Sequence, residues 1–286
     1  MVERGSPHAM AVLKSSPASL RMAGRVDWVA GCASLRTLLL LALGFAFSLA
    51  WAQGQAAPGR PEVWQLLIKW TPLVFSGFLF NLQVSLLSMA IGTVTGAMLG
   101  LGTMSPRRWV RTLCWPVVHF FRNAPWLVVL FGVMLLVPFQ TQVFGVDLRF
   151  APWMKAVVGL ALPVMANVAE IVRGGIQTIP TAQWESADSL AFSRRQALWM
   201  IVLPQAVKRM IPPWMNQYAL LTMNTTIISI VGIQEGLTMV QSALSAESRG
   251  DLLMPMYLML LTMFFVYCYP IARSTLWLER RYAVKN

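Results

Sequence analysis

Apolar residues occur in this chain in uninterrupted blocks long enough to cross a lipid bilayer. A transmembrane helix needs about 20 predominantly apolar residues to span a hydrocarbon core of roughly 30 Å. Of the 286 residues, 57% are hydrophobic and 12% are charged, whereas a soluble domain carries about 25% charged residues. This composition excludes both a disordered chain and an ordinary soluble enzyme. We therefore predict an all-α, polytopic helical membrane protein.

Six apolar blocks divide the chain. Residues 37–52 form a short first block, which ends in the small-x-small sequence Ala50-Trp51-Ala52. Residues 1–52 are therefore predicted to be an N-terminal leader. Its apolar block is either the end of a cleaved signal peptide or a retained extra span. A periplasmic linker is predicted over 53–70. Five core spans follow within a membrane domain over 71–281, with a tail over 282–286. The predicted core spans keep the numbers of the six blocks: the second covers residues 71–102, the third 115–139, the fourth 152–172, the fifth 211–233 and the sixth 252–277.

The distribution of Lys and Arg predicts the orientation of the chain. Of the 23 basic residues, 18 fall in the leader, the loop over 103–124, the loop over 173–210 and the C-terminal end from Arg273 onward. Cytoplasmic loops of membrane proteins carry such an excess. The loop over 173–210 and the C-terminus are therefore predicted to be cytoplasmic. The net charge of +12 is explained in this way, without nucleic acid as a partner.

Two small features of the spans carry structural predictions. Gly92, Gly96 and Gly100 repeat every four residues, which places them on one helical face where a neighbouring backbone can come close. Pro116, Pro125 and Pro138 punctuate the 115–139 block and predict a bent span. Arg122 in the same block is expected to extend toward the membrane interface.

The loop over 173–210 is predicted to hold two short amphipathic helices. The Gly174-Gly175 pair is expected to end the preceding span, and Thr181 to cap a helix over 182–191. Ser193 and Gln196 form a capping-box pattern that starts the second helix. Such a loop can dock into a groove of a partner protein or lie as an interfacial helix on lipid.

These residues resemble the permease subunits of bacterial polar amino-acid ABC importers, which have the MetI-like fold. Glu185-Ser186-Ala187 followed by Leu203-Pro204 is similar to the EAA loop of that family, and the resemblance covers residues 71–281. Phe121-Arg122-Asn123-Ala124-Pro125, the segment over 169–177 and Leu203-Pro204-Gln205-Ala206 are also similar to family segments.

The resemblance implies a non-catalytic subunit of an ATP-driven importer in the bacterial inner membrane. It implies three kinds of protein partner: two ABC ATPase subunits, a second permease chain and a periplasmic amino-acid-binding protein. No cofactor or metal is implied. The EAA loop is then a coupling helix that contacts the ATPase, and the implied contact residues are Glu185, Ser186, Ala187, Leu190, Ala191 and Phe192.

Two departures from the family pattern affect these expectations. Ala191 stands where the family usually has glycine, so we expect this turn to use ordinary backbone angles. Met223-Asn224-Thr225-Thr226 replaces Lys-Asp-Thr-Ser in the fifth core span. The loss of two charged residues there means that the substrate preference of relatives does not transfer directly.

Polar residues within the spans are candidates for the substrate path. The candidates are Asn167, Glu170, Thr222, Asn224, Thr225, Thr226 and Ser229. Two structural alternatives stay open: Glu170 can pair with Arg173 at i, i+3, and the residues of the fifth core span can hydrogen-bond between helices. A stand-alone secondary amino-acid transporter or channel is the rival function, with Glu170 as its one candidate buried carboxylate. The sequence contains no G-x-x-x-x-G-K-[ST] nucleotide-binding loop.

Overall fold

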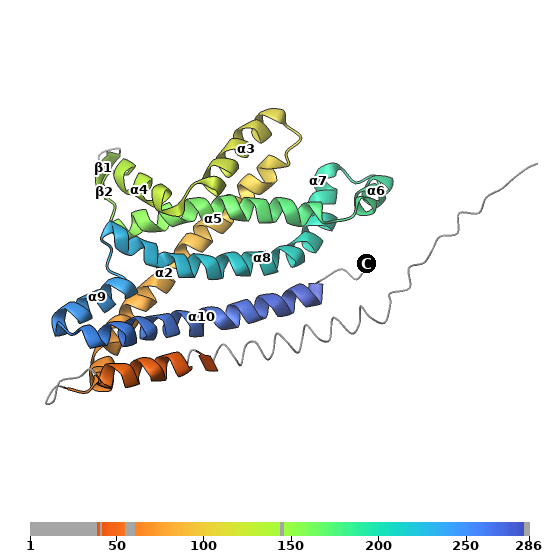
Figure 1. Cartoon of the computed structure of the whole chain (residues 1–286). Helices are drawn as coiled ribbons and strands as arrows, with labels where there is room; N and C mark the ends of the chain where they lie inside the picture. Colours follow the sequence, from red (N-terminus) through yellow and green to blue (C-terminus); the bar gives the residue numbers. More distant parts are fainter. Residues whose placement is uncertain (1–38, 41, 55–60, 144–145, 283–286) are drawn as a thin grey trace, which may run out of the picture.

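The computed structural model describes residues 39–40, 42–54, 61–143 and 146–282. Within these ranges the chain is a bundle of long helices (Figure 1), with one short β-hairpin. Among the described residues, three helices are long and apolar enough to cross a membrane, and two bent helix pairs raise the number to five if each pair is one span. These five agree with the predicted core spans. Residues 1–38 and 41 of the predicted leader, 55–60 of the predicted linker and 283–286 of the predicted tail lie outside the described residues.

The first apolar block is helical over 39–40 and 42–54. Ala52 is buried, and Phe45 and Leu49 pack against a hydrophobic cluster that also contains residues of α2 (Val63–Thr103) and α10 (Leu253–Tyr282). The predicted small-x-small sequence is therefore part of a helix that contacts the bundle. Whether a peptidase removes it stays a prediction.

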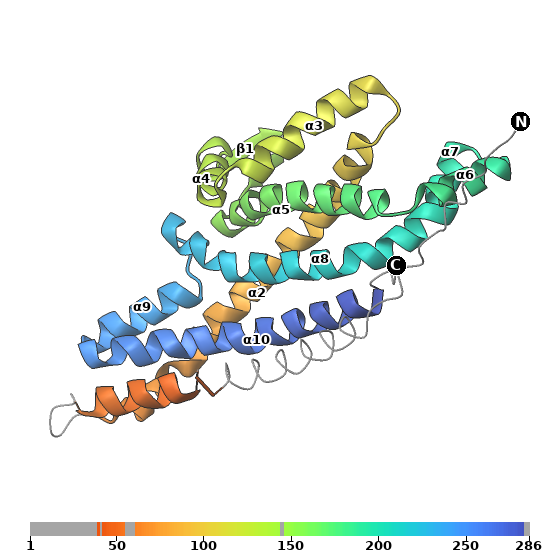
Figure 2. The same cartoon turned by 45° about the vertical axis from the view of Figure 1, so that its right-hand side comes forward.

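Helix α2 is 41 residues long and crosses the other long helices obliquely (Figures 1 and 2). It begins at Val63, so the prediction of a linker was wrong for residues 63–70. The predicted glycine face is confirmed, because a Cβ atom at Gly96 would lie 2.5 Å from the Met165 carbonyl oxygen of α5 (Pro152–Gln177). A Cβ at Gly100 would lie 2.7 Å from the Ala169 carbonyl oxygen. Glycine thus brings the backbones of α2 and α5 together.

The predicted third span is broken rather than merely bent. Helices α3 (Arg108–Asn123) and α4 (Trp126–Leu136) meet at an angle of 111°. Pro125 precedes α4 as its N-cap residue, and its ring together with the extended residue before it prevents the helix from continuing. Strands β1 (Gln140–Val143) and β2 (Val146–Arg149) then form an antiparallel hairpin that the sequence did not predict.

Helix α5 continues through the Gly174-Gly175 pair to Gln177, so the prediction that this pair ends the span was wrong. Met210 explains the presence of one glycine, because a Cβ at Gly175 would lie 2.5 Å from the Met210 Cγ. Helix α6 (Thr181–Ser189) follows. Its N-cap residue is Pro180 and not Thr181, and no side chain caps it.

One long helical segment then runs back across the bundle. It comprises α7 (Arg194–Gln196), the π-helix η1 (Ala197–Val202), α8 (Leu203–Asn224) and the 3₁₀-helix η2 (Thr225–Val231). Helix α9 (Gly236–Glu247) joins it at 52°. The short 3₁₀-helix η3 (Gly250–Leu252) leads into α10. In Figures 1 and 2, α5, α8 and α10 lie side by side.

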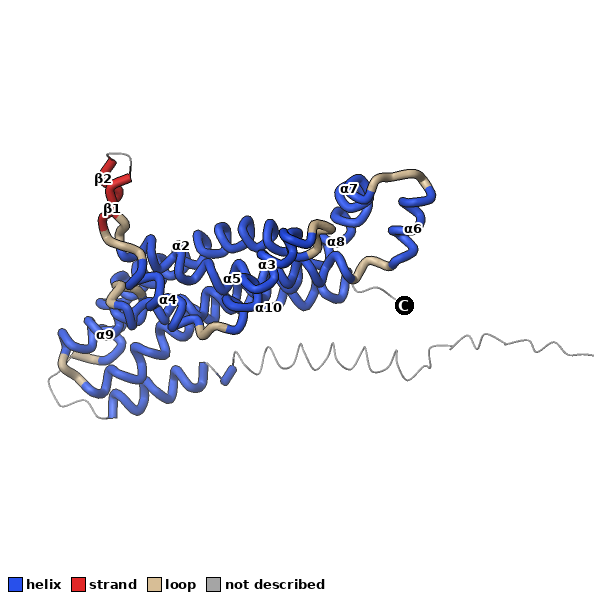
Figure 3. The backbone as a smooth tube through the Cα atoms, turned by 90° about the horizontal axis from the view of Figure 1, so that it is seen from above, coloured by secondary structure: helices blue, strands red, loops and turns tan. Residues whose placement is uncertain are grey.

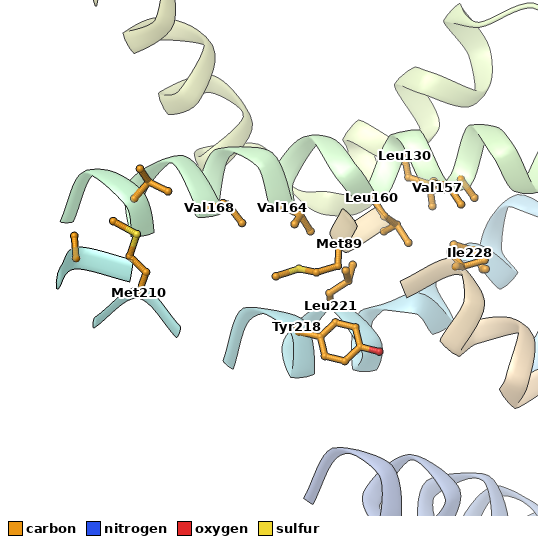
Figure 4. Close-up of a cluster of buried hydrophobic side chains, with 14 of the residues drawn as sticks. Met89, Leu130, Val157, Leu160, Val164, Val168, Met210, Tyr218, Leu221 and Ile228 are labelled. Carbon is orange, nitrogen blue, oxygen red and sulfur yellow. The ribbon is translucent and has the colours of Figure 1, made fainter. Parts of the chain in front are cut away.

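The main core lies where α5, α8 and the middle of α2 meet (Figure 4). Leu160, Val164, Leu221 and Ile228 are buried in this cluster, and Met89 reaches it from α2. The two ends of the bundle differ clearly: Figure 3 shows the β-hairpin at one end and α6 with α7 at the other. We call these the hairpin end and the α6 end.

Ion pairs and a buried lysine stabilise the hairpin end. Lys69 pairs with Glu247 at 2.7 Å, which connects the start of α2 to the end of α9. Arg249 pairs with Asp251 and donates to the Pro61 carbonyl oxygen at 2.8 Å. Lys155 is 2% exposed, and its ammonium group donates to the Val137 carbonyl oxygen just after α4. This cation therefore satisfies a free carbonyl at a helix C-terminus.

Candidate functional site

Helices α6 and α7 form a projection at the α6 end that is held by α5 and α8. The Arg209 guanidinium donates to the Thr178 carbonyl oxygen at 2.5 Å. Gln205 Nε2 donates to Gln183 Oε1 at 3.4 Å, which links α8 to α6. We call residues 181–196, together with the turn that they contain, the projecting loop.

The turn between the two helices is a Schellman motif with alanine in the left-handed position. Ala191 has φ 58°. Its amide donates to the Asp188 carbonyl oxygen at 2.9 Å, and the Phe192 amide donates to the Ala187 carbonyl oxygen at 3.1 Å. Glycine is the usual residue at this position. The expectation of ordinary backbone angles was therefore wrong: alanine keeps the turn that glycine favours and bears the steric cost.

The start of the second helix is as predicted. Ser193 Oγ accepts from the Gln196 amide at 3.4 Å, and Gln196 Oε1 accepts from the Ser193 amide at 2.9 Å. This reciprocal pair is a complete capping box. It satisfies two backbone donors at the helix start and so fixes the direction of the chain as it leaves the turn.

The structure distributes the predicted coupling residues unevenly. Glu185, Ser186, Leu190 and Ala191 are exposed, and Phe192 is half-buried. Leu190 is 70% exposed at the tip of the turn. In contrast, Ala187 is buried, so its prediction as a contact residue was wrong.

Ala187 instead supports the projecting loop from inside. Ala187 in α6 and Ala197 in η1 are both buried, and these two elements pack against each other. A small residue at each position allows the two elements to approach closely. The surface available to a partner is therefore formed by the exposed residues around Leu190.

Glu170 in α5 pairs with two arginines. Arg173 donates from Nη2 to Glu170 Oε2 at 2.7 Å and from Nε to Oε1 at 3.2 Å, which confirms the structural alternative for this pair. Arg122 Nη1 also lies 3.2 Å from Glu170 Oε2. Arg122 thus connects α3 to α5, and the expectation that it extends to the membrane interface stays a prediction. Asn167, one turn earlier, is half-buried.

The predicted polar residues of the fifth core span mostly bond to their own helix. Thr222 Oγ1 donates to the Tyr218 carbonyl oxygen at 3.0 Å, and Asn224 Nδ2 donates to the Leu220 carbonyl oxygen at 2.9 Å. Thr225, Thr226 and Ser229 each donate to the carbonyl oxygen three residues earlier. Such bonds make hydroxyl groups tolerable in an apolar environment without a ligand. Thr222 and Thr225 are buried, while Asn224, Thr226 and Ser229 are half-buried.

A buried polar cluster that the sequence did not predict joins α2, η2 and α9. Asn81 Nδ2 donates to Glu235 Oε2 at 2.8 Å and to Thr225 Oγ1 at 3.1 Å. Asn81 Oδ1 accepts from the Gly236 amide at 3.1 Å. Glu235 caps α9 by accepting from the Thr238 amide at 3.2 Å. We call Asn81, Thr225, Glu235 and Thr238 the Asn81 cluster.

The Asn81 cluster corrects the expectation that Glu170 is the one candidate buried carboxylate. Glu235 is fully buried, whereas Glu170 keeps part of its surface accessible. Glu235 and Thr238 form a reciprocal capping box in the structure, but Glu-x-x-Thr reverses the usual Ser/Thr-x-x-Glu signature, so this spacing did not indicate the helix start. The contact with Asn81, 154 residues away, left no local signal.

Gln217 in α8 is a second residue that the sequence did not identify. It is 8% exposed, and within the described part of the chain its Nε2 has no hydrogen-bond partner. A buried amide without a partner is costly. Within the same residues, no three His, Cys, Asp or Glu side chains gather closely enough to hold a metal ion.

Comparison with known proteins identifies the class to which this architecture belongs. Residues 92–284 match the family described as "Binding-protein-dependent transport system inner membrane component". The match covers the glycine face of α2, the projecting loop and α10. The chain belongs to this family, and it is therefore a multi-pass inner-membrane component of the ABC permease class.

Individual relatives are consistent with this assignment. The chain is 34% identical over 155 residues to the "Probable amino-acid ABC transporter permease protein y4tF" of Sinorhizobium fredii, covering 54% of this chain and 65% of that protein. It is 30% identical to the "Probable amino-acid ABC transporter permease protein YckA" of Bacillus subtilis, covering 77% of this chain and 93% of that protein. The chain spans 65%, 56% and 47% of the lengths of three of the curated relatives that it matches.

A solved structure shares the fold. The crystal structure of an amino acid ABC transporter with histidines superimposes with a TM-score of 0.65 at 26% identity. The superposition covers 75% of this chain and 96% of that chain. The predicted fold class, a type I importer permease bundle, is thereby confirmed.

Proposed function

We propose that this chain is the membrane-spanning subunit of an ATP-driven importer that moves a polar amino acid from periplasm to cytoplasm. A separate ATPase binds the projecting loop and supplies the energy for transport. The observation that carries the proposal is the shape of this loop: a buried support at Ala187 and Ala197 holds an exposed tip at Leu190. A rigid apolar tip of this kind fits a groove of another protein.

The connection between the projecting loop and the rest of the bundle supports a mechanical role. The helical segment from Arg194 to Val231 forms a bent pair with α9. It passes from the projecting loop to Thr225 in the Asn81 cluster. A displacement of the tip is therefore transmitted along a helix to the opposite end of the molecule. The loop itself does no chemistry.

The charge distribution supports the orientation of the proposal. Arg107, Arg108 and Arg111 lie at the α6 end, near the turn between α2 and α3, and Arg194 and Arg195 begin the second helix of the projecting loop. The hairpin end contains Lys69, Lys155 and Arg249, and each of these has a partner. The excess of basic residues at the α6 end supports an orientation with this end and the C-terminus in the cytoplasm.

The names of two relatives support an amino acid as the substrate, because both are called probable amino-acid ABC transporter permease proteins. A second permease chain and a periplasmic binding protein complete the proposed assembly, as the family description suggests. The half-buried residues Asn167, Thr226 and Ser229 stay candidates for a transient path through the membrane. Such neutral groups bind a zwitterion weakly, which suits release.

The test uses charge reversal on the projecting loop in proteoliposomes that contain the chain with its ATPase and binding protein. We expect Glu185→Lys to lower amino-acid uptake by at least tenfold, because it reverses a charge on the exposed surface of α6. Glu279→Lys is the matched control, since Glu279 is also an exposed glutamate but lies near the end of α10. This control should transport normally.

Three further measurements decide the result. Membrane insertion should be equal in both variants, and the stimulation of ATPase activity by the loaded binding protein should be lost in Glu185→Lys alone. Normal uptake by Glu185→Lys would refute a role for this surface. Uptake by the chain alone under an ion gradient, without ATPase, would instead establish the rival secondary transporter.

A further inference from the structure

A cavity of about 430 Å³ lies between the turn that joins α2 to α3 and the projecting loop. This volume lies within the range of small-ligand sites, about 300–1,000 Å³. Three arginines, Arg107, Arg194 and Arg195, line it from two separate parts of the chain. Leu101, Trp184 and Leu198 contribute to its apolar surface. The site therefore combines positive charge with an apolar wall.

The positive charge of this cavity is not neutralised within the described part of the chain. None of the three guanidinium groups makes an ion pair or a hydrogen bond with another residue there, in contrast to Arg122, Arg173 and Arg249. No acidic residue lines the cavity. These three arginines are exposed, and an anion bound among them would lower the repulsion between their like charges.

The surface next to the cavity is apolar and exposed. Trp109 and Leu113 on α3 are each 66% exposed, and Met98 on α2 is 69% exposed. Helices α2 and α3 flank the cavity, because Leu101 and Val110 both line it. In a membrane protein such surfaces contact acyl chains. A ligand with an anionic head in the cavity and hydrocarbon tails along α2 and α3 matches both surfaces.

We propose that this cavity binds the headgroup of an anionic phospholipid. The phosphate lies among Arg107, Arg194 and Arg195, and the first carbons of the tails contact the apolar wall. Basic pockets between helices at the cytoplasmic membrane face are known to select anionic headgroups. The bound lipid connects the α2–α3 turn to the projecting loop. This inference goes beyond the proposed function, because lipid binding does not require a partner protein to bind the projecting loop.

The test measures lipid retained by the full chain, purified from nanodiscs that contain phosphatidylglycerol and phosphatidylcholine in equal amounts. Native mass spectrometry should show phosphatidylglycerol selectively bound. A basic residue near an anionic membrane surface contributes about fivefold in affinity, so Arg107→Gln/Arg194→Gln/Arg195→Gln should weaken binding on the order of 100-fold. Retention of both lipids in equal amounts by the unmodified chain would overturn the proposal.

The matched control removes three cations that do not line the cavity. Arg108→Gln/Arg111→Gln/Lys208→Gln has the same change in net charge, and all three side chains are exposed. It should lose much less phosphatidylglycerol than the cavity variant, because none of these three side chains lines the cavity. Equal losses in the two triple variants would show a general charge effect and overturn the proposal.

Two further measurements distinguish a bound lipid from other occupants of the cavity. Val110→Phe fills the cavity while it keeps every charge, and it should reduce lipid retention even if the triple arginine variant fails to fold. Competition by millimolar inorganic phosphate that removes all bound lipid would indicate a phosphate site and refute a lipid site. Unchanged lipid retention with weakened ATPase binding in the triple variant would assign the cavity to an acidic segment of the partner.

Discussion

The contact between α2 and α5 predicts a large cost for a single methyl group at Gly96. A Cβ atom there would lie 2.5 Å from the Met165 carbonyl oxygen and 2.8 Å from the Val168 Cβ. Because both are fixed close to the α5 backbone, the two helices must separate to accept Gly96→Ala. Overpacking of this kind costs about 1–3 kcal/mol. Gly132→Ala in α4 is the matched control, because nothing lies within 4 Å of a Cβ at that position.

Both substitutions replace a helical glycine by alanine, which alone favours the helix by about 0.5–1 kcal/mol. Gly132→Ala should therefore stabilise the protein slightly. Gly96→Ala should have a free energy of unfolding about 1–3 kcal/mol below that of the control, which is the cost of the steric overlap. Equilibrium unfolding in detergent micelles, followed by circular dichroism, measures the difference. Equal stability of the two variants would refute the close approach of α2 and α5.

Three further predictions concern the projecting loop and the buried polar groups. Ala191→Gly should stabilise the turn by about 1 kcal/mol, because alanine at a positive φ costs about 1–2 kcal/mol; faster amide exchange at Phe192 in the glycine variant would contradict this. Gln217→Leu should leave the thermal midpoint unchanged or raise it, since it removes a buried donor without a partner, and a clear fall would reveal a partner for that amide. Asn81→Ala should lower the free energy of unfolding by about 1–3 kcal/mol, because it removes the donor to Glu235 Oε2 and the acceptor of the Gly236 amide. The loss should be smaller when Glu235→Gln is already present, and strictly additive losses in this double-mutant cycle would exclude the contact.

The spans could be predicted from the sequence because each depends on local composition. A run of apolar residues needs a bilayer or a core wherever it lies in the chain, so the five core spans agree with the observed helices and bent pairs. The 111° break at Pro125 was predicted only as a bend. Proline shows where a helix is interrupted, but the packing of α4 against α5 determines the direction in which the chain continues.

The presence or absence of glycine was the least reliable local signal for helix ends and turns. Gly174 and Gly175 are typical of a helix end, but Met210 from α8 fills the space over Gly175 and α5 continues. At Ala191 the opposite error occurred, because the hydrogen bonds of the Schellman motif hold alanine at φ 58°. In both places a contact outside the local pattern determined the backbone conformation.

The candidate site shows the same division between local and distant contacts. The Glu170–Arg173 pair follows from its i, i+3 spacing, whereas the additional contact with Arg122 depends on the direction of α3. The Asn81 cluster joins residues more than 140 positions apart. No local pattern contains such a pairing, so it was missed.

The π-helix η1 lets the chain absorb a difference of one residue between the projecting loop and α8. A π-helical turn holds one residue more than the α-helix that would otherwise occupy its place. Deleting one residue between Ser193 and Pro204 would therefore restore α-helical winding and leave Leu190 facing nearly its present direction. A residue added to an α-helix without such a turn would instead rotate the segment before it by about 100° around the helix axis. Relatives that are one residue shorter here should consequently present the tip in the same direction.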